Sequence, residues 1–200
     1  MAQRIKLNKV SLREQKQKMA LYQRFLPALE ARKQQFLMQL AVVRKDIREQ
    51  ESALASLTAD ISLWAPLVRD MEDVLRPFVK IRQVRVSMHN VAGLKIPLFQ
   101  EVVFEDPSYS AFATAYSFEI VLNRLREAIR RRERLRILLE QERILAEGFR
   151  KTSQRINLYE QRLIPECREA LRKIAVYLQD QQAAAVGVAK VAKRLLEAGL

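Results

Sequence analysis

The feature that most constrains this chain is a heptad pattern of apolar residues that begins at Leu12 and continues to Leu75. Steps of three and four residues alternate along it, and its apolar members are Leu12, Met19, Tyr22, Leu26, Leu29, Phe36, Leu40, Val43, Ile47, Leu54, Leu57, Ile61, Trp64, Val68, Met71 and Leu75. Gln15, Lys33 and Gln50 are the exceptions. A heptad sustained this long predicts a coiled-coil seam on one helix about 95 Å long, which no compact domain of this size contains.

The same spacing predicts a second long helix in the C-terminal half. Its seam positions are Leu135, Leu138, Leu145, Phe149, Thr152, Ile156, Tyr159, Leu163, Cys167, Ala170, Ile174, Leu178, Ala185, Val188, Ala192 and Leu195. Upstream, Leu122, Leu125 and Ile129 keep the spacing, but the phase slips by about one residue across Arg130–Arg136. This slip indicates a defect in the seam or a change of the crossing angle between the helices, or else simply a run of solvated charges.

Between the helices the period changes from the helical value to about two, which is the period of a β-strand. Val84, Val86 and Met88 alternate with polar residues, H-N-V-A-G supplies a turn, and K-I-P-L-F-Q-E-V-V-F-E is a second β-prone run. The pattern predicts a β-hairpin over Val84–Phe104. Pro97 confines its strand to an edge or a bulge because proline cannot donate to a central ladder. A two-stranded hairpin is marginal in water, so this one must rest on the helices or on a partner.

Prolines mark the expected ends of the elements. Pro77 closes the first helix, and Asp106-Pro107 with the serines that follow offers a start signal for the second. Because the connection returns on itself, the helices must pack antiparallel, with both termini at one end. The expected fold is predominantly α-helical, with two long helices in an antiparallel left-handed coiled coil and a small central β-hairpin region. The expected segments are residues 1–76, 77–109 and 110–200.

The sequence lacks the residue patterns of the common catalytic sites. His89 is the single histidine and Cys167 the single cysteine, so a histidine-rich metal site and an intramolecular disulfide are excluded. A lone thiol at an apolar helical position is usually a small core residue. No glycine belongs to a phosphate-binding loop, and the glycines are Gly93, Gly148, Gly187 and Gly199. We therefore expect no catalytic, cofactor-binding or metal site.

Basic residues dominate the charge of the chain. The formal net charge is +13, and within residues 1–45 only Glu14 and Glu30 oppose the lysines and arginines. Such a surface needs a negative counterpart, which could be nucleic acid, an anionic membrane surface or an acidic protein cavity. No apolar run approaches the length of a membrane span, so we expect a cytoplasmic or peripheral protein.

Two stretches resemble signatures of the D subunit of the V-type and A-type rotary ATPases. One is K-T-S-Q-R-I-N-L-Y-E-Q-R-L-I-P, and its matching residues are Lys151, Thr152, Arg155, Asn157, Glu160, Ile164 and Pro165. The other is V-A-G-L-K-I-P-L-F, matched by Val91, Gly93, Pro97 and Phe99. The N-terminal helix departs from the family pattern at Phe25-Leu26-Pro27, where the family has a glycine. The C-terminal tail is less charged than the family's, so the charged contacts of that tail cannot be transferred.

The resemblance implies the central rotor shaft of such an ATPase. Its partners would be a hexamer of catalytic A and non-catalytic B subunits, the small F subunit of the stalk, and a further stalk protein that links it to the membrane ring. It would couple ATP hydrolysis or synthesis to proton or sodium-ion translocation on the cytoplasmic face of a membrane, without catalysis, nucleic-acid binding, membrane insertion or homo-oligomerisation. The motif residues are candidate partner contacts. The candidates for the hexamer cavity are Lys6, Lys9, Arg13 and Lys16.

Two alternatives stay open at this level. A basic coiled-coil scaffold that binds nucleic acid or an anionic surface would show the same charge and helices.

Pro165 lies inside a predicted helix, where proline costs about 3 kcal/mol. It either bends that helix, which keeps the pair wrapped and makes the shaft eccentric, or is a tolerated local irregularity. Pro27 and Pro66 could act likewise in the first helix.

Overall fold

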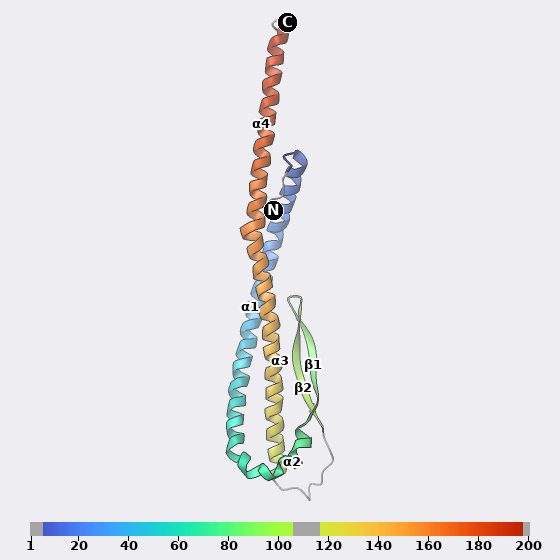
Figure 1. Ribbon diagram of the computed structural model, residues 1–200, viewed down its shortest axis with the longest axis vertical. Coiled ribbons are helices and arrows are strands. Elements are labelled where there is room, and N and C mark those ends of the chain that lie inside the picture. The colour runs from blue at the N-terminus through green and yellow to red at the C-terminus, as the bar shows by residue number, and fades with distance from the viewer. Residues whose placement is uncertain (1–5, 106–116, 198–200) are drawn as a thin grey trace. The chain divides into compact units, whose positions relative to one another are not determined.

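The computed structural model describes residues 6–105 and 117–197, apart from the side chains of Leu67, Val68 and Asp70 (Figure 1). Two long helical segments flank one β-hairpin, which confirms the expected fold class. The elements are α1 (Lys9–Trp64), η1 (Ala65–Met71), α2 (Glu72–Leu75), η2 (Arg76–Val79), β1 (Ile81–Val91), β2 (Leu94–Phe104), α3 (Ser117–Leu158), η3 (Tyr159–Leu163) and α4 (Ile164–Glu197). The start signal at Asp106-Pro107 lies outside the described residues.

The first helix ends earlier than the heptad pattern predicts. We expected it to run to the position before Pro77, but α1 ends at Trp64 and short 3-10 and α-helical turns follow. The cause is Pro66, which lies at the start of η1, has no backbone N–H and disfavours the α conformation of the residue before it. Apolar residues recur beyond Pro66 because this segment still contributes to a core. Leu75 and Phe78 pack in one buried cluster with residues of α3, which are Phe118, Val121 and Leu122.

The chain divides into two compact units, which we describe separately. The terminal unit comprises Met1–Arg32 and Lys151–Leu200, and the hairpin unit comprises Lys33–Arg150. Each unit therefore contains part of α1 and part of the second long helical segment. Both terminal segments belong to the same unit.

In the hairpin unit, α1 and α3 run antiparallel, as expected. The Nε of Arg44 donates to Oε1 of Glu142 at 2.7 Å, whereas Leu54, further along α1, lies by Leu135, which is earlier in α3. The partner numbers fall as the α1 numbers rise. The core between the helices and the hairpin consists of Phe36, Leu40, Val43, Ile47, Ile96, Leu138 and Leu145.

The hairpin is confirmed, with a tight turn at the predicted place. Ala92 and Gly93 have φ angles of 49° and 82°, and two consecutive positive values are typical of the type I′ turn whose twist matches that of paired strands. The predicted alternation does not produce one buried face, however. The pairing shifts between Arg85 and Val86, and beyond that bulge Val86 and Met88 are 43% and 64% exposed.

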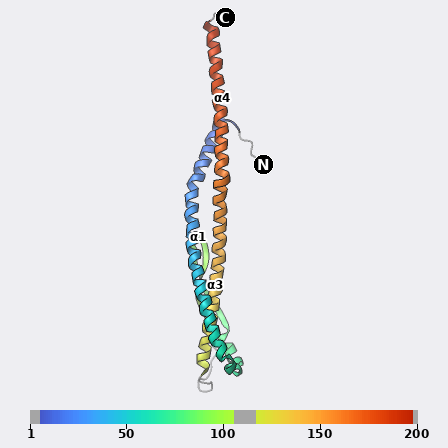
Figure 2. The same cartoon turned by 90° about the vertical axis from the view of Figure 1, so that its left-hand side faces the viewer.

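In the terminal unit, α1 also runs antiparallel to the C-terminal helical segment. The rings of Tyr22 and Tyr159 stack with centroids 5.4 Å apart and planes 21° apart. Earlier in α1, Lys18 lies close enough to the later residue Cys167 for its charge to act on the thiol. Cys167, Ala170 and Ile174 are buried. In contrast, residues 181–197 of α4 are exposed throughout, and Figure 2 shows this end of α4 continuing beyond the start of α1.

Pro165 follows a π-helical turn. The backbone N–H of Ile164 bonds to the carbonyl of Tyr159, five residues earlier. In a regular α-helix the proline ring would clash with the carbonyl of Gln161, and the wider turn of η3 (Tyr159–Leu163) changes that spacing. The proline is thus associated with a local irregularity, while the proposed bend stays a prediction. Pro27, by comparison, lies inside α1 without ending it.

Candidate coupling surfaces

The β-hairpin is attached to α3 at three levels, which hold it on the helix pair (Figure 1). At its base, the guanidinium of Arg126 donates to the carbonyls of Phe78 at 3.0 Å and Glu105 at 3.3 Å. At mid-height, Nε2 of the buried Gln141 donates to the carbonyl of Pro97 at 2.6 Å. At the tip, the side chain of Leu94 lies on the backbone at Gly148. The hairpin is therefore supported by its own chain, as its marginal stability required.

Gly148 allows the tip of the hairpin to approach α3. A Cβ built at this position would lie 2.2 Å from Cδ1 of Leu94 and 3.4 Å from Cζ of Phe36. A glycine inside a helix is less favourable than alanine by about 0.5–1 kcal/mol. We conclude that close packing explains its presence here. The sequence offered this signal, a glycine in the middle of a strongly helical stretch, but not the identity of its neighbour.

Replacing Gly148 with alanine should loosen the hairpin. The added methyl group must displace Leu94, and overpacking of this kind costs about 1–3 kcal/mol, which exceeds the gain in helix propensity. Hydrogen exchange of amides in β1 and β2 should accelerate. Gly187→Ala is the matched control, because no atom lies within 4 Å of its Cβ position. That variant should leave hairpin exchange unchanged, and equal effects of the two substitutions would contradict the packing argument.

The four candidate contacts on the hairpin have different surroundings. Val91 packs against the core cluster of the hairpin unit, and Gly93 forms the exposed turn. Pro97 and Phe99 are half-buried and pair with Met88 and Val86 on the neighbouring strand. Val91 and Gly93 thus maintain the shape of the hairpin. Pro97 and Phe99 lie opposite Met88 and Val86, whose exposed side chains are accessible to a partner.

The candidate contacts of the second motif lie in the terminal unit, on both sides of η3. Thr152 is buried and Ile164 half-buried, so they serve the packing of the helix pair. The exposed members are Lys151, Arg155, Asn157 and Pro165.

The terminal unit carries most of the chain's charge. Its two segments contain 17 lysines and arginines against 7 acidic residues, a formal charge of +10 out of +13. Lys6, Lys9, Arg13 and Lys16 are all exposed. Asn8 caps α1 by accepting a hydrogen bond from the Ser11 backbone at 2.7 Å. The first turn of α1 has no acidic residue, although acidic residues are preferred there because of the helix dipole. Helix stability therefore does not explain these cations.

The thiol of Cys167 is part of the packing of the terminal unit. It is 6% exposed, and burial raises the pKa of the Cys167 thiol above its usual value. A buried thiol with a raised pKa is a poor nucleophile. Within residues 6–105 and 117–197, no helix combines the length and the hydropathy that crossing a bilayer requires.

Comparison with known proteins identifies one family along nearly the whole chain. The profile of the family described as the ATP synthase D subunit matches residues 11–194. A V-type ATP synthase D subunit from Borreliella burgdorferi is 33% identical over 193 residues, which cover 96% of this chain and 95% of the relative. One from Chlamydia pneumoniae is 31% identical over 199 residues, covering 98% and 95%. One from Chlamydia caviae is 31% identical over 212 residues, covering 98% and 96%.

Proposed function

The chain belongs to the family of ATP synthase D subunits, and from this premise we propose a separate role for each of its two units in coupling ATP turnover to ion translocation. It is a stalk subunit of a rotary ATPase, in which rotation links ATP turnover to ion translocation. In this proposal the terminal unit contacts the catalytic hexamer, and the hairpin unit contacts the other stalk subunits.

The terminal unit stands in the cavity of the hexamer of A and B subunits. The observation that carries this assignment is the formal charge of +10 on the terminal unit, whose basic residues Lys6, Lys9, Arg13 and Lys16 are all exposed. A protein cavity with acidic groups would attract this surface, and complementary charge sets orientation and association rate more than affinity. Lys6, Lys9, Arg13 and Lys16 contact that cavity. Rotation requires such contacts to be exchangeable, because a strongly preferred angle would trap the rotor.

Paired helices suit the transmission of torque. An isolated helix frays and bends easily, whereas two antiparallel helices with an interdigitated seam support each other. The surface of such a pair is not symmetric, so it presents a different face to each of several identical subunits. Differential contact of this kind can shift the conformational equilibrium of each subunit in turn.

The hairpin unit contacts the small F subunit of the stalk and the stalk protein that links it to the membrane ring. Its charge is only +3, so the electrostatic argument for the hexamer cavity does not extend to it. Pro97 and Phe99 support contacts made through the neighbouring exposed residues of β1. The complex would be peripheral, on the cytoplasmic face of its membrane.

Affinity purification of the native complex tests the proposal. We expect the tagged chain to bring down the A and B subunits, and the isolated chain to hydrolyse no ATP because its sequence has no phosphate-binding loop. ATP turnover that stays with the chain through rigorous removal of contaminating ATPases would contradict the non-catalytic role. Recovery of nucleic acid in place of the hexamer, with a steep salt dependence, would favour the basic scaffold instead.

A further inference from the structure

The second long helical segment loses its regular hydrogen bonding at one place in the terminal unit. At η3 the backbone N–H of Ile164 bonds to the carbonyl of Tyr159, five residues earlier instead of four. Pro165 follows and has no N–H, so it cannot close a bond to the turn before it. A side-chain bond joins Arg162 to Glu166 across this place at 3.0 Å. Both side chains are more than half exposed, so their ion pair holds the turns together only weakly.

The helix α1 has an interruption of its own close by. Pro27 lies inside α1 and cannot bond to the carbonyl of Gln23, four residues earlier. The stack of Tyr22 on Tyr159 fixes the level at which the two helices meet. Because the helices are antiparallel, Pro27 and Pro165 lie on opposite sides of that stack, about 8 Å and about 9 Å away along the axis. Both helices are therefore interrupted within about 17 Å of the pair.

The core of the helix pair is thin at the same level. Ile156 and Cys167 are buried, but none of the ten residues between them is buried. On the other side of the seam, α1 contributes no buried residue before Phe36. Few buried contacts and weakened hydrogen bonding are the conditions under which part of a structure moves most easily. Backbone and packing therefore both weaken the pair at this level.

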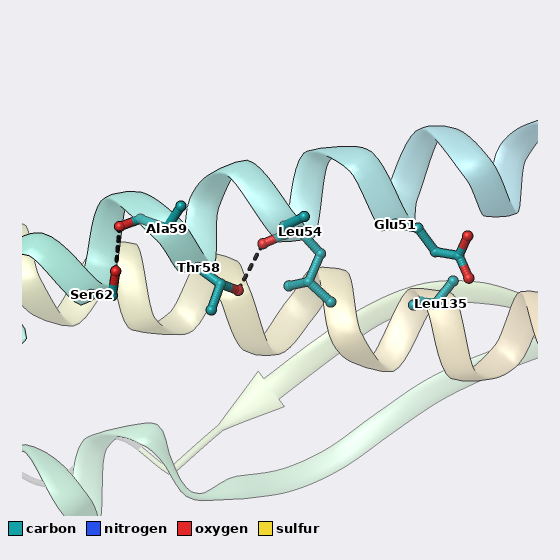
Figure 3. Close-up of a pocket in the computed structure, with 7 residues that line it drawn as sticks. Glu51, Leu54, Thr58, Ala59, Ser62 and Leu135 are labelled. Atoms are coloured by element: carbon teal, nitrogen blue, oxygen red, sulfur yellow. Dashed lines mark hydrogen bonds between the residues drawn. The ribbon is translucent and has the colours of Figure 1, made fainter.

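The helix pair of the hairpin unit has the opposite character. From Glu51 to Ser62, α1 is a regular helix beside α3, and Leu54 lies by Leu135 (Figure 3). No proline occurs in α3. Buried side chains recur along it at about every turn, and they include Glu133, Ile137, Leu138, Gln141 and Leu145. This stretch of α3 is therefore a reference for a stiff part of the same long helical segment.

We propose that the terminal unit contains a flexible joint, formed by Tyr22–Pro27 of α1 and Tyr159–Pro165 of the second segment. At this joint the shaft samples a range of bend and twist angles, which distinguishes it from a fixed bend at Pro165. The tyrosine stack is the pivot, because two flat rings with planes 21° apart can slide on each other and keep contact. Its role rests on the function proposed above, in which such a joint lets the shaft follow the cavity as the hexamer changes shape.

Distances between two spin labels on the full chain test the joint. Labels attached through p-acetylphenylalanine at the exposed residues Gln154 and Arg172 span it over 18 residues. The matched control pair is Arg132 and Arg150, which are exposed and have the same separation on α3. We expect the distance distribution across the joint to be about twice as wide as that of the control pair. Equal widths would overturn the proposal.

Replacing the prolines tests the cause of the flexibility. Pro27→Ala and Pro165→Ala together restore two backbone donors, so the width across the joint should fall toward that of the control pair. Arg168→Ala, at an exposed position on α4, should leave the width unchanged. In the unmodified chain, amides of residues 161–167 should exchange about tenfold faster than those of residues 137–145. A width that the proline replacements do not change, or equal exchange in the two stretches, would contradict the assignment.

These measurements use the chain without its partners, so they are separate from the test of the proposed function. If the hexamer co-purifies and the two label pairs give equal widths, the joint fails while the proposed function stands. If the widths differ as expected but the unmodified chain does not recover the hexamer, the proposed function fails, and with it the role of the joint in rotation.

Discussion

Replacing Phe36 with alanine should reduce the free energy of unfolding by about 3–5 kcal/mol, because a fully buried aromatic side chain is removed and its cavity remains. Phe36 is 0% exposed and joins the core shared by α1, α3 and the hairpin. Its ring also lies beside the site of Gly148. The loss should therefore extend to the hairpin, and urea denaturation with hydrogen exchange would measure both effects.

Leu37→Ala is the matched control for this prediction. Leu37 is the next residue of the same helix but is 41% exposed, so its truncation should change stability by less than about 1 kcal/mol. Similar losses from the two substitutions would show that the core of the hairpin unit is not where we describe it.

The second large effect is expected from reversing the charge at the start of α1. The combined substitutions Lys6→Glu, Lys9→Glu, Arg13→Glu and Lys16→Glu lower the formal net charge from +13 to +5. Assembly with the hexamer should weaken by about tenfold or more, chiefly through slower association. The helix should not unfold, since acidic residues interact favourably with the N-terminal end of the helix dipole. Binding kinetics and circular dichroism would separate the two effects.

A control variant with the same net charge separates the effect of where the reversed charges lie from the effect of how many are reversed. Arg48, Arg82, Lys95 and Arg134 are exposed residues of the hairpin unit, and their reversal to glutamate also gives +5. This variant should assemble with the hexamer nearly as well as the unmodified chain. Since the attraction is electrostatic, the difference between the two variants should also shrink as salt rises. Equal defects in both variants at low salt would contradict the cavity assignment.

The elements that the sequence predicted well are those with local and repeated signals. The heptads indicated both long helices, and the H-N-V-A-G stretch indicated the hairpin turn, because each signal depends on residues close together in the chain. The predicted end of α1 was wrong because apolar spacing continued past Pro66, and the backbone preference of one proline outweighed it. For the candidate surfaces, the excess of basic residues near the start of the chain indicated the four cations, all of which are exposed.

The features that the sequence did not provide depend on contacts between distant segments. Nothing near Gln141 indicates that its side chain bonds to the carbonyl of Pro97, 44 residues away. The support at Gly148 likewise needs Leu94 from the hairpin. The register shift between Arg85 and Val86 leaves Gln100 of the neighbouring strand unpaired, and such a shift of pairing leaves no clear pattern in one strand alone.

The π-helical turn before Pro165 also has a numerical consequence for the seam. From Thr152 to Ile174 the predicted seam takes six steps in 22 residues, whereas six steps of a heptad repeat span about 21. The extra residue appears as two successive steps of four, from Tyr159 to Leu163 and from Leu163 to Cys167. A π-turn accommodates one additional residue in a helix. The sequences before and after η3 are thus out of phase by one position, and the turn restores the common phase. A change of chain length by one residue here would shift every side chain downstream around the helix.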